Sequence, residues 1–236
     1  MAIELLVCAA TAGEIAAFGL PGDPLPDDGA HVLVDGGRTA LAVTGVGAPC
    51  TLMRLPALLD RLRPAAALTI GIAGAYPDSG YGVGEVVMAR SECWADVGFE
   101  LPDEPGFRHV SESPFGGFYQ PITLTLDARF LPGPEGVGNS ADIPADIPIV
   151  AAATVNTCTG TRRTGLLRGR LFSAEIENME GAAFGVACAA AGIPACEVRA
   201  ISNIAGDRDM RPDNIGAAIA RLARHLRACR ERMEER

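Results

Sequence analysis

The chain has 236 residues, of which 48% are hydrophobic, and its 29 acidic and 20 basic side chains give a formal net charge of −9. Binding to a nucleic-acid polyanion needs clustered Lys and Arg, so this acidic balance argues against nucleic acid as a partner. The length and the apolar content support one sizeable α/β domain, and no shift in composition divides the chain. We therefore expect a single domain over residues 1–236.

The cysteines, the histidines and the N-terminus exclude several further classes of protein. The seven cysteines stand in apolar stretches without CxxC spacing, and the three histidines are far apart. This pattern is typical of reduced core cysteines and predicts no metal site. The N-terminus is apolar but lacks a basic segment and contains Glu4 and Glu14, which predicts a first strand and not a signal peptide. The chain has no uncharged apolar run of about 18 residues, so we expect a cytoplasmic protein that does not enter a membrane.

The first expected element is a buried strand over residues 3–10, followed by a short helix over residues 11–18. Thr11 is the expected N-cap of this helix, and Glu14 stands three residues later, which is the capping-box pattern. A helix cap and a place in an active site explain Glu14 equally well. The sequence leaves both interpretations open.

The next elements are marked by Pro, Gly and alternating apolar residues. They are a loop over 20–29, a hairpin over 31–47 that turns at 35–37, an amphipathic helix over 51–64 and a strand over 66–76. That strand ends in small residues that include Ala73 and Gly74. Small residues let backbone groups approach a ligand, although tight strand packing explains them too. The run lacks the third glycine of a dinucleotide fingerprint and the GK[ST] of a phosphate loop, so we expect no cofactor.

The second half of the chain alternates buried strands with helices. Residues 82–100 predict a long strand, and residues 101–145, rich in Pro, Gly and Asp, predict irregular loops beside a pocket. Residues 147–155 predict a strand that leads into a polar turn and a short helix. This alternation is typical of a mainly parallel sheet with helices on both faces, which is a three-layer α/β/α architecture.

A carboxylate and an amide follow two strands in the last third of the chain. Residues 171–176 predict an apolar strand, and Glu180 stands where it gives way to a helix ended by Gly192. Residues 195–202 predict a second buried strand, after which Asn203 begins a polar loop. Parallel strands joined by a crossover helix run in the same direction, and ligands bind at their carboxyl ends. We therefore expect Glu180 and Asn203 to face one pocket.

Several motifs in this chain occur in the order in which one family carries them. They are ATAGE at 10–14, VTGVG at 43–47, GIAGAY at 71–76, GVGEVV at 82–87, NMEGAA at 178–183 and VRAISN at 198–203. On these motifs the chain resembles the purine nucleoside phosphorylase/uridine phosphorylase superfamily, on its nucleosidase side. The resemblance implies a mixed central sheet of the nucleoside phosphorylase type, a small-molecule nucleoside substrate and a homo-oligomer of two or more subunits.

The chain differs from two branches of the superfamily at motif positions, and these differences indicate which branch it resembles. Methylthioadenosine/S-adenosylhomocysteine nucleosidases usually carry Asp after I-S, where this chain has Asn203. The ISN sequence followed by Gly-Asp-Arg-Asp at 206–209, together with VNT at 155–157, resembles futalosine hydrolases. Those enzymes cleave futalosine to hypoxanthine and dehypoxanthinylfutalosine in menaquinone biosynthesis. Phosphorylases carry a basic G-D-P-x-R phosphate site after the first strand, whereas ATAGE has no arginine, so water is the expected nucleophile.

The resemblance also implies roles for residues at the sugar. Hydrolysis of an N-glycosidic bond passes through a ribosyl cation, so a site needs carboxylates near the ribose, an oriented water and donors to the departing base. Glu180 is expected to bind the ribose hydroxyls, with Met179 against the sugar face. Glu14 is expected to position and deprotonate the water.

At the base, the expected residues are an amide and backbone groups. Asn203 is expected to hydrogen-bond N7 or O6 of hypoxanthine, although an amide cannot supply a proton as a carboxylic acid does. Asp207 or Asp209 is a candidate for that acid, unless Arg208 holds their loop instead. The expected walls of the base pocket are Ala73, Gly74, Val155, Asn156 and Thr157.

Two alternatives stay open at this point. The first is another enzyme of the superfamily, either a methylthioadenosine-type nucleosidase or a purine nucleoside phosphorylase, which the phosphate dependence of base release would reveal. The second is a non-catalytic nucleoside-binding protein, against which the presence of Glu14 and Glu180 argues. The sequence does not fix the group accepted at the 5′ position of ribose, which the loops over 98–145 are expected to contact.

Overall fold

A computed structural model describes residues 2–19, 31–102, 106–114, 116–125, 147–207 and 211–234 of the chain. Its strands are β1 (Leu5–Ala9), β2 (His31–Val34), β3 (Thr39–Val43), β4 (Ala66–Ala75), β5 (Val86–Trp94), β6 (Gly98–Glu100), β7 (Phe107–His109), β8 (Ile122–Thr123), β9 (Ile149–Thr154), β10 (Ile176–Asn178) and β11 (Ala195–Ile204). Its α-helices are α1 (Ala12–Ile15), α2 (Ala48–Leu62), α3 (Arg162–Phe172), α4 (Gly181–Ala191) and α5 (Pro212–Glu234). Short 3₁₀ segments are η1 (Ala16–Phe18), η2 (Asp35–Gly37), η3 (Val110–Glu112) and η4 (Gly116–Tyr119).

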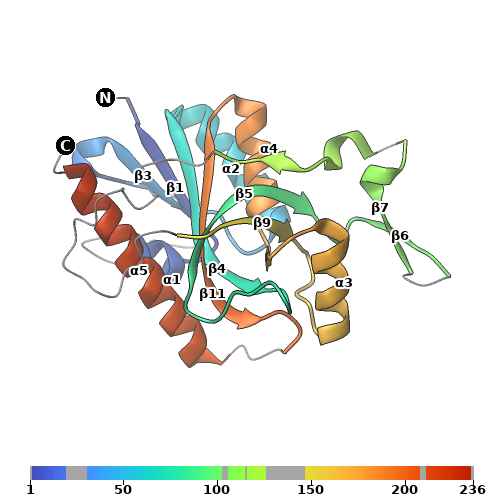
Figure 1. Cartoon of the computed structure of the whole chain (residues 1–236). Coiled ribbons are helices and arrows are strands. Elements are labelled where there is room, and N and C mark those ends of the chain that lie inside the picture. The colour runs from blue at the N-terminus through green and yellow to red at the C-terminus, as the bar shows by residue number, and fades with distance from the viewer. Residues whose placement is uncertain are drawn as a thin grey trace.

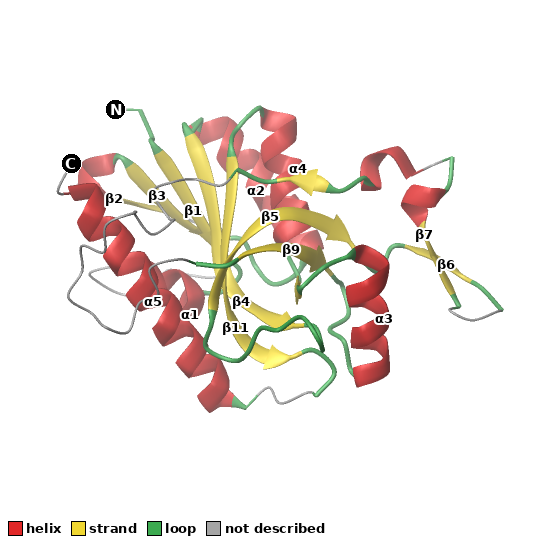
Figure 2. Cartoon of the chain, in the orientation of Figure 1, coloured by secondary structure: helices red, strands yellow, loops and turns green. Residues whose placement is uncertain are grey.

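The elements form three layers, with a mixed sheet between two groups of helices (Figures 1 and 2). On one face, the core joins α2 and α4 to the sheet through residues such as Leu55, Leu59 and Phe184. On the other face, residues such as Ile15 and Leu222 join α1 and α5 to it. Both faces are covered, so strands β1 and β3 are buried along their whole length. The α/β/α class predicted from the sequence is confirmed.

The main sheet has the strand order β10-β9-β5-β11-β4-β1-β3-β2, with β8 paired to β5. Strands β1, β3, β4 and β11 run parallel to one another, whereas β5 is antiparallel to β11 and parallel to β9. An additional antiparallel pairing joins β10 to β4, with Ile176 opposite Ala75 and Glu177 opposite Gly74. That pairing closes β4, β11, β5, β9 and β10 into a ring, which brings the end of β4 between β10 and β11.

Two sequence predictions about strands were wrong. Residues 171–176 are not a strand, because Leu171 and Phe172 complete α3 and the strand begins only at Ile176. The apolar run was misread because Leu171 is an exposed helical residue and not a buried one. In addition, β10 and β11 are not parallel neighbours: β10 is antiparallel to β4, and β4 is parallel to β11.

The hairpin predicted over 31–47 is confirmed, since β2 and β3 pair with Val34 opposite Thr39. The long strand predicted over 82–100 is divided into β5 and β6 by a bend. Strand β6 pairs with β7 in a separate two-stranded sheet that extends away from the main sheet (Figure 1). The loop predicted over 20–29 and the part of the predicted irregular region over 126–145 fall outside the described residues.

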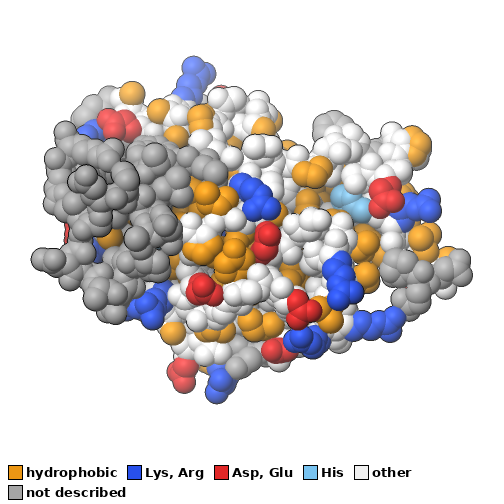
Figure 3. Space-filling view, in the orientation of Figure 1, with side chains coloured by type: hydrophobic (Ala, Val, Ile, Leu, Met, Phe, Trp, Pro, Cys, Tyr) orange, Lys and Arg blue, Asp and Glu red, His pale blue; other side chains and the backbone are white. Residues whose placement is uncertain are grey.

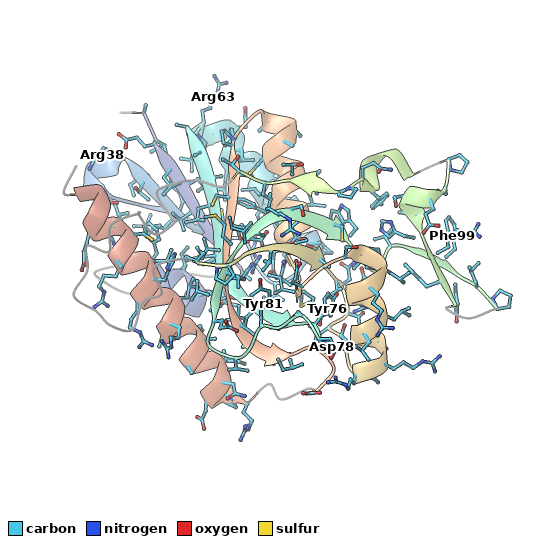
Figure 4. The ribbon with its side chains drawn as sticks, viewed as in Figure 1. Arg38, Arg63, Tyr76, Asp78, Tyr81 and Phe99 are labelled. Carbon is cyan, nitrogen blue, oxygen red and sulfur yellow. The ribbon has the colours of Figure 1, made fainter. Side chains whose placement is uncertain are left out.

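One face of the molecule carries a group of apolar side chains (Figure 3), and a salt bridge joins the segment after β4 to α3. In the space-filling view, apolar side chains gather near the middle of one face with charged side chains around them (Figure 3). Tyr76 and Asp78 follow β4 and lie beside α3 (Figure 4), where Arg162 Nη2 contacts Asp78 Oδ1 at 3.1 Å. Among the described helices, none is long and apolar enough to cross a membrane.

Candidate active site

A cavity of about 360 Å³ lies where the ends of β4, β10 and β11 meet. Its apolar lining includes Val46, Ile72, Val155, Met179, Ile215 and Ile219. Its polar lining consists of Thr11, Glu14, Glu177, Asn178, Glu180, Ser202 and Asn203. An apolar cavity with a few convergent polar groups is the usual form of a small-molecule site.

Glu14 is both a helix cap and a residue of the cavity. Thr11 caps α1 by accepting a hydrogen bond from the Glu14 backbone N–H, and Glu14 Oε2 accepts in return from Thr11 N at 3.1 Å and Thr11 Oγ1 at 3.0 Å. Its other oxygen, Oε1, accepts from the Ile72 backbone N–H at 3.0 Å. The predicted capping box is therefore present, and it fixes the carboxylate against the wall of the cavity.

Burial is the main influence on the pKa of Glu14. Because desolvation disfavours the charged carboxylate, it raises the pKa of Glu14 above its ordinary value of 4.5, although Arg199 acts in the opposite direction. A carboxyl group with a raised pKa is a stronger base once ionised, which suits it to take a proton from water.

Arg199 is a buried guanidinium that links the carboxylates of the site. Its Nε donates to Glu197 Oε1 at 2.7 Å, and its Nη1 contacts Glu180 Oε2 at 3.3 Å. Burial opposes the charge of Arg199, but Glu197, Glu180 and Glu14 outweigh it and raise the pKa of the guanidinium. Gly71 makes room for this group, since a Cβ there would lie 2.6 Å from Arg199 Nη1 and 2.7 Å from Glu14 Oε1.

Glu180 precedes α4, but its side chain does not cap that helix. Instead, Glu180 Oε1 accepts from the Gly47 backbone N–H at 2.8 Å and Oε2 faces Arg199. The start of α4 is bound by Asn178, whose Oδ1 accepts from Glu180 N at 3.0 Å and Gly181 N at 2.7 Å. The side chain of Glu180 is therefore held at the cavity by Gly47 and Arg199 and does not cap the helix.

Behind the cavity, two fully buried carboxyl groups meet. Asn178 Nδ2 donates to Glu92 Oε1 and, at 3.1 Å, to Glu197 Oε1, while Thr154 Oγ1 donates to Glu92 Oε2 at 2.9 Å. Burial and the neighbouring Glu197 raise the pKa of Glu92 well above its ordinary value. Glu197 Oε2 has no hydrogen-bond partner among the described residues. Two adjacent buried carboxyls repel each other when both are charged, and this repulsion adds to the cost of ionising Glu92.

The floor of the cavity is formed around Gly74. In β4, Gly74 pairs with Glu177 of β10 on one side and with Asn203 of β11 on the other. Strand β11 has a bulge at Ser202, whose single hydroxyl hydrogen has two acceptors in reach, Asn203 Oδ1 at 2.9 Å and Ala73 O at 3.2 Å. Glu180 and Asn203 thus share one cavity, as the sequence predicted. Their strands, however, are brought together by β4, which pairs with both, and not by a parallel crossover between neighbouring strands.

Comparison with known proteins identifies the family. A family model described as the phosphorylase superfamily matches residues 28–231. The futalosine hydrolase of Thermus thermophilus is 35% identical over 189 residues, covering 78% of this chain and 77% of that protein. The futalosine hydrolase of Acidothermus cellulolyticus is 32% identical over 230 residues, covering 94% and 88%. The chain belongs to the phosphorylase superfamily, among the futalosine hydrolases.

The fold of this superfamily member is also found among solved structures. It superposes on the futalosine hydrolase structure of Helicobacter pylori with a TM-score of 0.76 and 18% identity, covering 98% of this chain and 99% of that one. The nucleoside phosphorylase type of fold predicted from the sequence is thereby confirmed.

In this superfamily member, most of the site residues named from the sequence line the cavity. They are Glu14, Ala73, Gly74, Val155, Met179, Glu180 and Asn203. Asn156 stands outside it, because its Nδ2 donates to Asp96 Oδ1 at 3.0 Å on the surface. Asp207 is exposed after β11 and also stands outside the lining, while Arg208 and Asp209 are not among the described residues.

Sequence reasoning missed Arg199 and Glu177 as residues of the site. Both were visible as charged residues inside apolar strands, where an unpaired charge is costly. The residues that pair with these charges lie far away in the sequence. A charged residue in an apolar strand therefore indicated a special position but not what the side chain does there. Among the described residues, no three His, Cys, Asp or Glu side chains are grouped in a way that would hold a metal ion.

Proposed function

We propose that this chain hydrolyses the N-glycosidic bond of futalosine, releasing hypoxanthine and dehypoxanthinylfutalosine. The identity of 35% and 32% with two futalosine hydrolases, over most of each chain, supports this substrate. The observation that carries the chemistry is the placement of Glu14 and Glu180 in one cavity with Arg199 between them.

In the proposed reaction, water attacks C1′ of the ribose while the bond from C1′ to N9 breaks, its electron pair leaves with the base, and the base takes up a proton from solvent. Glu14, ionised and held by Thr11 and Ile72, takes a proton from the water. Glu180 accepts hydrogen bonds from the ribose hydroxyls, with Met179 against the sugar. The two carboxylates also stabilise the positive charge that develops on the ribosyl group.

Asn203 stabilises the leaving base by hydrogen bonding. Its Oδ1 accepts from Ser202 Oγ at 2.9 Å, which leaves the Nδ2 group to donate to N7 or O6 of hypoxanthine. An acid role for Asp207 gains no support from its exposed position outside the cavity lining.

We also propose that the protein is a cytoplasmic homo-oligomer. Light scattering coupled to size-exclusion chromatography tests the oligomeric state, and a mass equal to one chain would contradict it. Cell fractionation tests the location, which a periplasmic or secreted protein would contradict.

The deciding experiment is chromatographic detection of free base released from futalosine, methylthioadenosine and inosine, each with and without phosphate. We expect hypoxanthine from futalosine at a rate independent of phosphate. Preferential release of adenine would indicate a methylthioadenosine-type nucleosidase, and an absolute need for phosphate would indicate a phosphorylase. Binding of futalosine without turnover would indicate a nucleoside-binding protein.

A further inference from the structure

Glu177 is a buried carboxylate whose place in the cavity the proposed reaction does not use. It is 5% exposed and lines the cavity from β10. A Cβ on Gly74 would lie 3.4 Å from Glu177 Cγ and 3.3 Å from Asn203 Nδ2. The Nδ2 group of Asn203 and the side chain of Glu177 therefore both lie beside Gly74 at the end of β4, so one ligand placed there can reach both residues.

Glu177 accepts two hydrogen bonds from Thr159 and lies beside the guanidinium of Arg168. Thr159 donates to it twice, from N to Oε1 at 2.9 Å and from Oγ1 to Oε2 at 2.5 Å, and Arg168 Nη1 lies 3.8 Å from Oε2. Arg168 is itself fixed by Thr157 O and Thr159 Oγ1, both at 2.9 Å. A carboxylate accepts about four hydrogen bonds, of which Thr159 supplies two, and the Tyr76 hydroxyl lies beside the group as a further donor. The carboxylate of Glu177 thus keeps acceptor capacity for a ligand.

A carboxylate of this kind can distinguish between purines by the donors and acceptors on their Watson–Crick edge. A 6-oxopurine such as hypoxanthine carries a donor at N1–H and an acceptor at O6. A 6-aminopurine such as adenine carries an acceptor at N1 and a donating amine at C6. A carboxylate facing N1 binds the first and repels the lone pair of the second, while the Nδ2 group of Asn203 matches O6 and not an amine.

We propose that Glu177 accepts a hydrogen bond from N1–H of the base and, together with Asn203, selects 6-oxopurine nucleosides against 6-aminopurine nucleosides. This inference rests on the proposed function, since it specifies which base the site releases. Losing a hydrogen bond to a charged group reduces affinity roughly 10- to 100-fold. A site that leaves its polar group unpaired with the wrong ligand discriminates by at least that factor.

The test compares kcat/KM of the full chain for futalosine and for its 6-amino analogue, in wild type and in Glu177→Gln. A glutamine amide serves N1 of either base, so we expect the preference for futalosine to fall by roughly tenfold or more. The matched control is Glu175→Gln, two residues earlier, whose carboxylate instead accepts from Ala151 N. That control should keep the wild-type ratio.

An equal loss for both substrates in Glu177→Gln would overturn the inference, because a merely structural Glu177 lowers both rates without changing their ratio. If that variant does not fold, wild-type binding decides: hypoxanthine should bind at least roughly tenfold more tightly than adenine. Equal binding of the two bases would overturn the inference. Failure of the wild-type protein to release hypoxanthine from futalosine would instead refute the proposed function, and the base-binding comparison would still test Glu177.

Discussion

At the residue scale, the site depends on side chains that serve the fold and the chemistry together. Glu14 is the clearest example, because the capping box that forms α1 also aims its carboxylate at the cavity. The sequence left open whether Glu14 caps the helix or belongs to a site. In the structure it does both, because it completes the capping box and lines the cavity. Its role as the base stays a prediction.

We expect Glu14→Gln to reduce kcat for futalosine by about 10²- to 10⁴-fold, the usual contribution of a general base. The base acts only when ionised and its pKa is raised by burial, so wild-type kcat/KM should fall with decreasing pH at a point above pH 4.5. Glutamine has the same shape and keeps one acceptor oxygen, so we expect the variant to keep the fold, as measured by circular dichroism. A variant with wild-type turnover would remove Glu14 from the mechanism.

Cys158 offers a direct test of where the ligand binds. It lines the cavity and is the one exposed cysteine of the seven, and burial raises the pKa of Cys93 and Cys188 to about 12. Iodoacetamide should therefore modify Cys158 first, and hypoxanthine should slow the modification, as measured by peptide mass spectrometry. Cys158→Ser is the control for background labelling. Labelling at an unchanged rate with saturating hypoxanthine would place the ligand elsewhere.

At the scale of elements, the sequence predicted best what local patterns determine. The capping box at Thr11, the hairpin over 31–47 and the apolar helix before Gly192 each follow from residues a few positions apart. The pairing of β10 with β4 joins residues about a hundred positions apart, and no local pattern encodes it. For the same reason Glu177, which that pairing places in the cavity, escaped prediction.

The one-turn helix α1 should be sensitive to its cap. Thr11→Ala removes the hydroxyl that accepts from Glu14 N and donates to Glu14 Oε2, whereas Thr11→Ser keeps it. We expect the alanine variant to lose about 0.5–2 kcal/mol of unfolding free energy in urea and to lose activity by a larger factor than the serine control. Equal activities in the two variants would mean that the cap does not position Glu14.

At the scale of the whole molecule, the buried acidic groups make stability depend on pH. Glu92 faces Glu197 and Arg199 of β11, Thr154 of β9 and Asn178 of β10. Its pKa in the folded state is raised, so its contribution to stability is complete below about pH 4.5 and is lost as the pH rises through the raised value. Ionisation of Glu92 therefore lowers the stability of this protein, whose net charge is already −9.

We expect Glu92→Gln, which resembles the protonated group, to reduce the loss of unfolding free energy that accompanies a rise in pH above about 4.5. The difference in slope from wild type should approach about 1.4 kcal/mol per pH unit where Glu92 titrates, as measured by urea unfolding from pH 5 to 9. Glu197→Gln should instead destabilise the protein at all these values, because it removes a partner of the buried Arg199. Parallel pH curves for wild type and Glu92→Gln would show that Glu92 is not the group that titrates.

The closed ring of strands has a consequence for how the protein acquires activity. Strand β10 has three residues, pairs with β4 across a long sequence separation and carries Glu177 between two other elements of the cavity. Such distant contacts form late, after the entropy of closing the intervening loop has been overcome. During refolding, protection of the β10 amides from hydrogen exchange and recovery of hydrolysis should therefore appear together, after the sheet from β1 to β4 is already protected.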